Sequence, residues 1–116
     1  MKEDKPYLLH IKDAINKIEI FTKGIDYRKF IENDMIQSAV IRQIEIIGEA
    51  SKQLPREIKD KHSEIEWKAT TDFRNVIIHE YFGIDLKIMW DIIKNELPPL
   101  ERKLKRLHRT FKNKSK

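Results

Sequence analysis

The chain has 116 residues, which is the usual size of one domain and enough to bury a single core. It has no cysteine, which excludes disulfides and thiolate zinc sites, and its net charge is +5 at pH 7. It lacks the roughly 18 consecutive apolar residues of a membrane span, and its charged start is unlike a secretory signal. We therefore expect a soluble, cytoplasmic protein.

Two stripes of apolar residues at helical spacing occupy the first half of the chain. The first covers residues 8–18, and its helix is expected to end near Gly24. The second covers residues 36–54 and stops at Pro55, which cannot continue a helix. Gly48 lies inside this second helix, where glycine lowers stability, so we expect another element to pack closely against it.

Polar connectors and further helices complete the chain. Residues 25–33 are expected to form a connector with a short turn, and residues 55–66 are polar and charged, which is typical of a loop or a short helical turn. A third helix is expected over residues 67–81, with Gly83 just past its end. A fourth helix is expected to begin after Asp85, which is a good N-cap residue.

The last part of the chain combines a proline pair with a basic end. Pro98 and Pro99 are expected to kink or break the helix, and apolar spacing then resumes. No segment alternates in the manner of a strand. The sequence therefore predicts an all-α bundle of four to five helices, with one domain over residues 1–111 and a basic tail over 112–116.

The positive charge lies at the C-terminal end. Residues 101–116 contain eight basic side chains and one acid, so this segment carries +7 and the remainder of the chain −2. Such a stripe could attract the phosphates of RNA, or it could be a solvated helix end whose cations suit the helix dipole. The residues alone favour neither interpretation.

An eight-residue stretch of the predicted third helix contains four side chains that can bind phosphate, transfer protons or form hydrogen bonds: Arg74, Asn75, His79 and Tyr81. Arginine binds phosphate through a planar, permanently charged fork, and histidine transfers protons near neutral pH. RNA supplies its own nucleophile, the 2′-hydroxyl, which His79 could deprotonate while Arg74 neutralises charge on the phosphate. Asn75 could orient His79 or contact the phosphate. Together they are the minimum equipment for cutting RNA without a metal.

The spacing of this motif bears on how such a site is assembled. On one straight helix Arg74 and His79 diverge by about 140°, whereas Asn75 and His79 share a face. Arg74 and His79 could meet through the reach of the arginine, through unwinding near Gly83, or across a symmetric dimer. Spacing alone also leaves open a plainer arrangement, in which Arg74 pairs with an acid and His79 caps the helix end.

The motif of Arg74, four residues, His79, one residue and Tyr81 resembles the signature of the HEPN superfamily, in particular its HepT-like toxin family. Several further blocks occur in the same order as in that family. They are its second helix at 40–50, the entry to the motif helix at 65–67, and its closing stretch at 79–85, Trp90 and 97–100. The resemblance covers most of the chain.

This resemblance implies an α-helical homodimer that acts as a metal-independent endoribonuclease toxin and needs no cofactor. Arg74 and His79 take the catalytic positions, and Asn75 takes the supporting polar position beside the arginine. The family is usually encoded beside a minimal nucleotidyltransferase antitoxin. That partner neutralises the toxin by transferring AMP to the motif tyrosine, here Tyr81.

Two positions depart from the family pattern. Asp72 stands where a small residue is common, and Glu66 stands where proline is common. Asp72 adds negative charge near an RNA cleft, although its spacing of two residues from Arg74 directs it to another face. Glu45 and Glu49 are interpreted as an ordinary charged helix face, from which Glu45 could still approach the cleft in a folded dimer.

Two other functions are kept as alternatives. The chain could be a catalytically silent helical partner, or substrate subunit, of a minimal nucleotidyltransferase, which an acidic or closed cleft would favour. It could also be a nucleotide-sensing dimer in which Arg74 holds a free nucleotide. No metal site is expected, because the remaining histidines have no metal-ligand spacing on one face: His10, His62 and His108.

Overall fold

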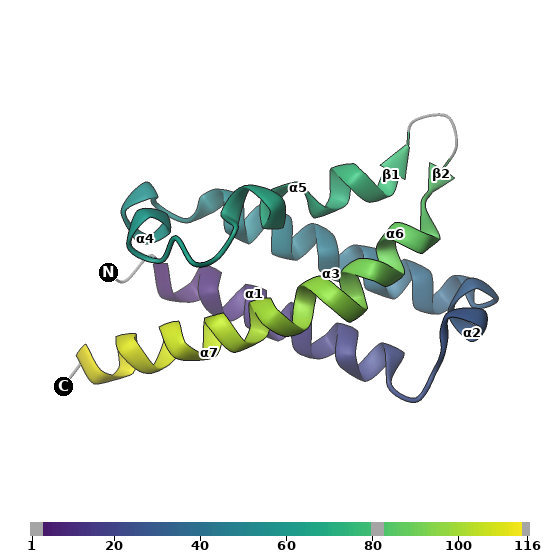
Figure 1. Ribbon diagram of the computed structural model, residues 1–116, viewed down its shortest axis with the longest axis horizontal. Helices are drawn as coiled ribbons and strands as arrows, with labels where there is room; N and C mark the ends of the chain where they lie inside the picture. Colours follow the sequence, from purple (N-terminus) through teal and green to yellow (C-terminus); the bar gives the residue numbers. More distant parts are fainter. Residues whose placement is uncertain (1–3, 80–82, 115–116) are drawn as a thin grey trace.

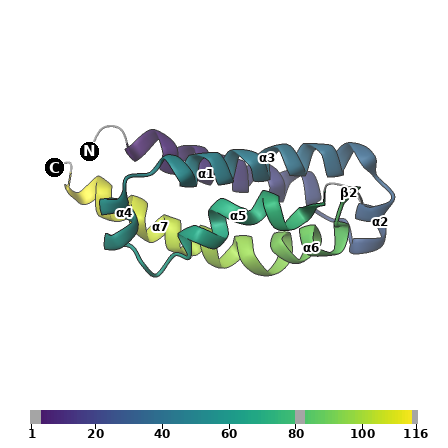
Figure 2. The ribbon, with the colours of Figure 1, turned by 90° about the horizontal axis from the view of Figure 1, so that it is seen from above.

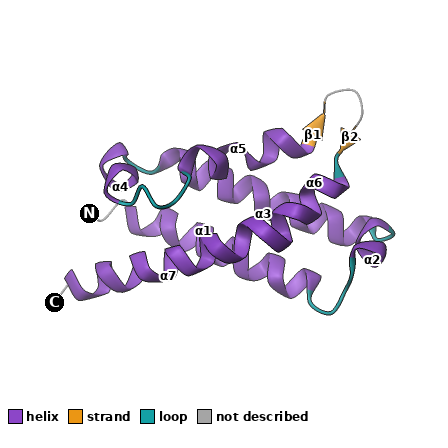
Figure 3. Cartoon of the chain, viewed as in Figure 1, coloured by secondary structure: helices purple, strands orange, loops and turns teal. Residues whose placement is uncertain are grey.

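The computed structural model describes the backbone of residues 4–79 and 83–114 and the side chains of residues 6–78 and 83–107. The regular elements of the described chain are helices joined by loops, with one short pair of strands (Figures 1 and 3). Its elements in order are α1 (Asp4–Thr22), α2 (Tyr27–Ile31), α3 (Asp34–Gln53), α4 (Arg56–Lys61), α5 (Trp67–Ile77), β1 (Ile78–His79), β2 (Gly83–Ile84), α6 (Leu86–Asp91), the π-helical segment η1 (Ile92–Glu96) and α7 (Leu97–Lys114).

The long helices form one bundle. α1 and α3 pack together as a hairpin, α5 packs along α3, and α7 packs against α1 (Figures 1 and 2). This arrangement confirms the all-α bundle expected from the sequence. None of the helices over residues 4–79 and 83–114 has the length and apolarity of a membrane span.

A single apolar core joins these helices. It follows from the helical spacing of the apolar residues, since each stripe turns one face of its helix inward. The α1 and α3 stripes supply side chains that are fully buried: Ile11, Ile15, Ile18, Val40, Ile44 and Ile47. Phe73 and Ile77 bring α5 onto this core, so the helix that carries the motif has a fixed face.

The predicted helix ends agree with the structure in the first half of the chain. α1 ends at Thr22, two residues before Gly24, whose φ of +76° is the left-handed conformation that glycine adopts readily. α3 ends at Gln53, just before Pro55. Asp85 caps α6 as predicted, because its carboxylate accepts a hydrogen bond of 3.0 Å from the backbone N–H of Ile88.

Gly48 marks the line along which α3 and α5 touch. A Cβ atom at this position would lie 3.0 Å from the backbone carbonyl oxygen of Thr71 in α5. The structure thus confirms the close packing that a glycine inside a helix indicated. The approach matters for the site, because it brings α3 side chains one turn away within reach of the motif helix.

Replacing Gly48 with valine is expected to destabilise the protein by about 1–3 kcal/mol, because the added side chain must push α5 away from α3. Ser38→Val is the matched control, since Ser38 lies exposed on the same helix. It should change the free energy of unfolding by about 0.5 kcal/mol or less. Urea unfolding measures both, and equal stabilities for the two variants would contradict the close approach.

Of the kink or break expected at Pro98 and Pro99, the break is wrong. The described chain stays helical from α6 through η1 into α7, and the prolines lie in the first turn of α7. The backbone N–H of Leu97 bonds to the carbonyl oxygen of Ile92, a wide π-type turn. This wide turn ends directly before the prolines, so they lie at the start of α7. Their missing N–H groups cost least at the start of a helix.

Glu19 of α1 approaches Glu101 of α7, and this contact makes stability depend on pH. Partial burial raises the pKa of Glu19 above its ordinary value, and the hydrogen bond and charge of Glu101 raise it further, while Lys105 opposes the shift. A carboxyl group whose pKa is higher in the folded than in the unfolded protein contributes stability at pH values below its pKa in the unfolded protein. The gain is lost as pH rises through the folded pKa.

Glu19→Gln is therefore expected to raise stability at pH 7 and to change it little at pH 4. The gain at pH 7 should not exceed about 0.5 kcal/mol, because water screens charges on exposed side chains. Thermal melting of both proteins at the two pH values measures the difference. A variant that is less stable than the wild type at pH 7 would show that the carboxylate is stabilising.

Candidate active site at the end of α5

Local sequence explains why α5 begins and ends where it does. The indole N–H of Trp67 donates a hydrogen bond of 3.1 Å to the carbonyl oxygen of His62, which holds the start of the helix against its connector. The helix ends at Ile77, in a run of β-branched residues (76–78) that fit a strand better than a helix. The backbone N–H of Asp85 then bonds to the carbonyl oxygen of Ile77 at 2.7 Å.

The helix predicted over residues 67–81 is thus four residues shorter than expected. Ile78 pairs with Ile84, and His79 pairs with Gly83, in a two-stranded antiparallel arm (Figure 3). Gly83 has a φ of +80°, which glycine adopts without strain. The prediction that Asn75 and His79 share a helical face is wrong, because the backbone of His79 belongs to β1.

Arg74 lies on the last turn of α5, on the side that faces α3. Its side chain is 48% exposed, and its Nε–H donates a hydrogen bond of 2.9 Å to Oε2 of Glu45, which is itself 40% exposed. A guanidinium has five N–H groups, so this contact leaves the outer fork of two Nη atoms for another acceptor. Arg74 therefore remains able to bind an oxyanion while Glu45 holds its inner edge.

The sequence leaves open that Arg74 pairs with an acid and that Glu45 approaches the cleft in a dimer, and the structure shows the two side chains paired within one chain. Glu45 lies three residues before Gly48, so both occupy one face of α3. Once Gly48 marks the face that meets α5, Glu45 is the acid on that face within reach of the motif. Glu45 thus belongs to a charged helix face, as interpreted from the sequence, and its partner on α5 is Arg74.

Asp72 lies on a different side of α5 from Arg74, as its spacing predicts. It lines a groove together with Val76 from α5 and with Asp91 and Glu96 from the segment before α7. The negative charge that departs from the family pattern is therefore directed away from the contact between Arg74 and Glu45.

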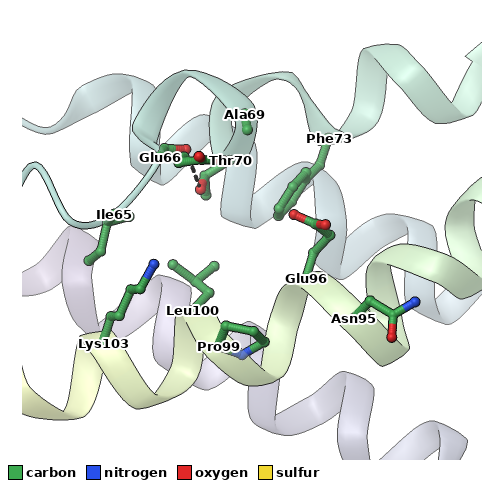
Figure 4. Close-up of a pocket in the computed structure, with 10 residues that line it drawn as sticks. All are labelled: Ile65, Glu66, Ala69, Thr70, Phe73, Asn95, Glu96, Pro99, Leu100 and Lys103. Atoms are coloured by element: carbon green, nitrogen blue, oxygen red, sulfur yellow. Dashed lines mark hydrogen bonds between the residues drawn. The ribbon is translucent and has the colours of Figure 1, made fainter.

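A neighbouring pocket of about 240 Å³ lies between α5 and α7 (Figure 4). Phe73 and Leu100 supply apolar walls. Glu96 of η1 and Lys103 of α7 project toward the opening from the side opposite α5 (Figure 4). The hydroxyl of Thr70 donates to the carbonyl oxygen of Glu66 at 3.0 Å within its own helix turn. Of the motif residues with described side chains, neither Arg74 nor Asn75 lines this pocket.

The structure places the predicted site residues as follows. Arg74 and Asn75 are exposed neighbours on the last turn of α5. The backbone of His79 lies in β1, two residues past the helix end, while its side chain is outside the described part. Tyr81 lies outside the described residues altogether. Among the described side chains, no cluster of three or more acidic or histidine residues could hold a metal ion.

Comparisons with known proteins cover the same region. A family model described as "Ribonuclease HepT-like" matches residues 11–107. A protein of Caldanaerobacter subterraneus subsp. tengcongensis named "Putative RNase" is 40% identical over 107 residues, which cover 92% of this chain and 96% of that protein. A protein of Methanocaldococcus jannaschii with the same name is 41% identical over 103 residues, which cover 89% of this chain and 94% of that protein.

A third relative, "Probable ribonuclease HepT" of Thermococcus cleftensis, is 41% identical over 108 residues. The match covers 93% of this chain and 98% of that protein. No solved structure matches the chain. The relatives thus have nearly the same length as this chain and align with it almost end to end.

Proposed function

Because the chain belongs to the HepT-like ribonuclease family, we propose that this ribonuclease is a metal-independent endoribonuclease whose reaction is carried by Arg74 and His79. The observation that carries the proposal is the position of Arg74. It is exposed on the last turn of α5 with its inner edge held by Glu45, and the chain leaves the helix just before His79. Arg74 and His79 therefore do not share one straight helix, on which their side chains would diverge by about 140°.

The proposed reaction uses the RNA as its own nucleophile. His79 accepts the proton of a 2′-hydroxyl, the 2′-oxygen bonds to the adjacent phosphorus, and the bond from phosphorus to the 5′-oxygen breaks. The departing oxygen takes up a proton, from the second His79 of a dimer or from water. The products are a 2′,3′-cyclic phosphate and a 5′-hydroxyl. No metal-bound water enters this scheme.

Arg74 acts on the charge that builds up in this reaction. Two non-bridging oxygens of the phosphate become more negative as the fifth bond forms, and the outer fork of a guanidinium matches their geometry. The 2.9 Å contact with Glu45 restricts the long side chain, which lowers the entropy that phosphate binding would otherwise cost. Asn75, the next residue along the exposed turn, contacts the phosphate or orients His79.

We further propose that the protein is the toxin of a toxin–antitoxin pair and acts as a homodimer. Its partner is a minimal nucleotidyltransferase, which forms a bond between the hydroxyl of Tyr81 and the α-phosphorus of ATP and releases pyrophosphate. The added nucleotide brings a phosphate charge and bulk to a residue two positions from His79. It would repel and obstruct the RNA backbone at that point.

The chemical nature of the RNA ends tests the reaction. An RNA oligonucleotide cut by the purified protein is expected to carry a cyclic phosphate and a 5′-hydroxyl at the cut, as measured by mass spectrometry. An RNA with a single 2′-deoxy residue at that site should resist cutting there. Products with a 3′-hydroxyl and a 5′-phosphate would instead show attack by water and would contradict the scheme.

Glu45 offers a milder test of how Arg74 is positioned. Glu45→Ala is expected to lower kcat about tenfold with little change in KM, because the unrestrained arginine contributes less in the transition state. Glu45→Gln keeps an acceptor for Nε and should retain more activity. Stability should change by about 1 kcal/mol at most, because the pair is exposed. Faster cutting by Glu45→Ala would mean that Glu45 competes with RNA for Arg74.

A further inference from the structure

A shallow hollow of about 330 Å³ lies on the outer surface between α1 and α3. Most of its exposed atoms are apolar, and Ile46 and Ala50 of α3 form its purely aliphatic part. The polar side chains around them come from both helices: Tyr7, His10, Arg42, Glu45, Glu49 and Gln53. Ligand sites combine apolar surface with convergent polar groups and begin at about 300 Å³, so this hollow lies at the small end of their range.

Glu45 connects this hollow to the proposed active site. The same carboxylate that lines the hollow accepts the hydrogen bond from Arg74 at 2.9 Å. Arg42 lies one turn before Glu45 on α3, so the two side chains begin about 5–6 Å apart. A strand of RNA with its reacting phosphate on Arg74 could therefore lay an adjoining nucleotide over α3 and into the hollow.

The residues of the hollow fit a nucleoside. Tyr7 and His10 are three apart on α1, so their flat rings share a face and can stack on a base. Arg42 can bind the next phosphate along the strand. Glu49 and Gln53, four apart on α3, can reach the edge of that base. A carboxylate only accepts hydrogen bonds, so Glu49 favours a base with an exocyclic amino group.

We propose that this hollow, which includes Tyr7, Arg42 and Glu49, is a binding subsite for the nucleotide next to the cut phosphate. It takes adenine, cytosine or guanine in preference to uracil, because each of these bases has an exocyclic amino group that can donate to Glu49, whereas the donor of uracil is one ring N–H between two carbonyl oxygens. This proposal rests on the proposed ribonuclease function. It adds to that function a surface that selects where RNA is cut.

Cutting of RNA oligonucleotides with every base on either side of one cleavage site tests the subsite. The wild type should disfavour uracil at one adjacent position. Tyr7→Ala should lower kcat/KM roughly tenfold, as loss of one stacked base does, and Glu49→Gln should reduce the discrimination against uracil because an amide also donates. Tyr27→Ala and Glu32→Gln are the controls, since both residues are exposed around α2. A wild-type kcat/KM in Tyr7→Ala together with an unchanged base preference in Glu49→Gln would overturn the proposal while the nuclease stands.

A binding experiment distinguishes an error in the proposed subsite from an error in the proposed reaction. Short 2′-O-methyl RNAs cannot supply the nucleophile, so their affinity is measured without cutting, by NMR titration of the folded protein. Glu49→Gln should reduce the difference in affinity between adenine-containing and uracil-containing RNAs. Arg42→Gln should weaken the binding of both RNAs to a similar extent. Equal affinity of the wild type for both RNAs would overturn the base selection. Glu49 is exposed, so its substitution leaves folding intact.

Discussion

Replacing His79 with alanine is expected to slow RNA cutting by roughly 10²–10⁴-fold, the usual contribution of a positioned proton-transfer group. The physical reason is that a 2′-hydroxyl is a poor nucleophile until a base takes its proton. Binding of RNA should change little, because phosphate contacts come from arginine and lysine residues. Single-turnover rates on a labelled RNA oligonucleotide measure the chemical step without product release.

His108→Ala is the matched control for this experiment, since it removes a histidine elsewhere in the sequence. It should cut RNA at the wild-type rate. Circular dichroism of both variants establishes that the helices are retained. A His79→Ala protein that is folded and cuts within about threefold of the wild type would remove His79 from the mechanism, because proton-transfer residues contribute far more than that.

Transfer of AMP to Tyr81 is expected to have the second large effect, a loss of cutting on the order of 100-fold or more, because the added charge and bulk obstruct the RNA path. The modified protein can be prepared by co-expression with the nucleotidyltransferase encoded nearest to it. Intact-mass spectrometry then measures the added nucleotide, and the same RNA assay measures the rate. Enzymatic removal of the nucleotide should restore cutting.

Tyr81→Phe keeps the ring but has no hydroxyl to accept AMP. This variant should therefore keep cutting RNA after exposure to the nucleotidyltransferase and ATP, while the wild type is silenced. Tyr27→Phe, whose tyrosine is on α2, should be silenced like the wild type. Modification of Tyr81→Phe to the same extent as the wild type would move the acceptor to another residue.

The sequence predicts the bundle well because its signals are local. Apolar spacing defines α1 and α3, Gly24 and Pro55 follow their ends, and Asp85 caps α6. Each of these depends on residues within one or two turns of each other. Gly48 goes further, since a glycine in a helix interior indicates a neighbour that the structure identifies as the α5 backbone.

The errors occur where two elements compete or where distant residues meet. Helical spacing extends the third helix through residue 81, but a β-branched run and Gly83 favour the β1–β2 arm instead. The prolines at 98–99 suggest a break, but the π-helical turn η1 accommodates them within a continuous helical rod. The contact of Arg74 with Glu45 spans 29 residues of sequence, so no local pattern specifies it.

The central claim is that this chain cuts RNA through its own side chains, and cleavage in EDTA tests it most directly. Purified wild-type protein, shown by intact mass to be unmodified at Tyr81, is incubated with RNA in excess chelator beside Arg74→Ala and the control Arg56→Ala. We predict that the wild type and Arg56→Ala cut equally with and without EDTA, while Arg74→Ala is slower by roughly 10²–10³-fold. Loss of wild-type cutting in EDTA, or full activity of Arg74→Ala, would contradict the account.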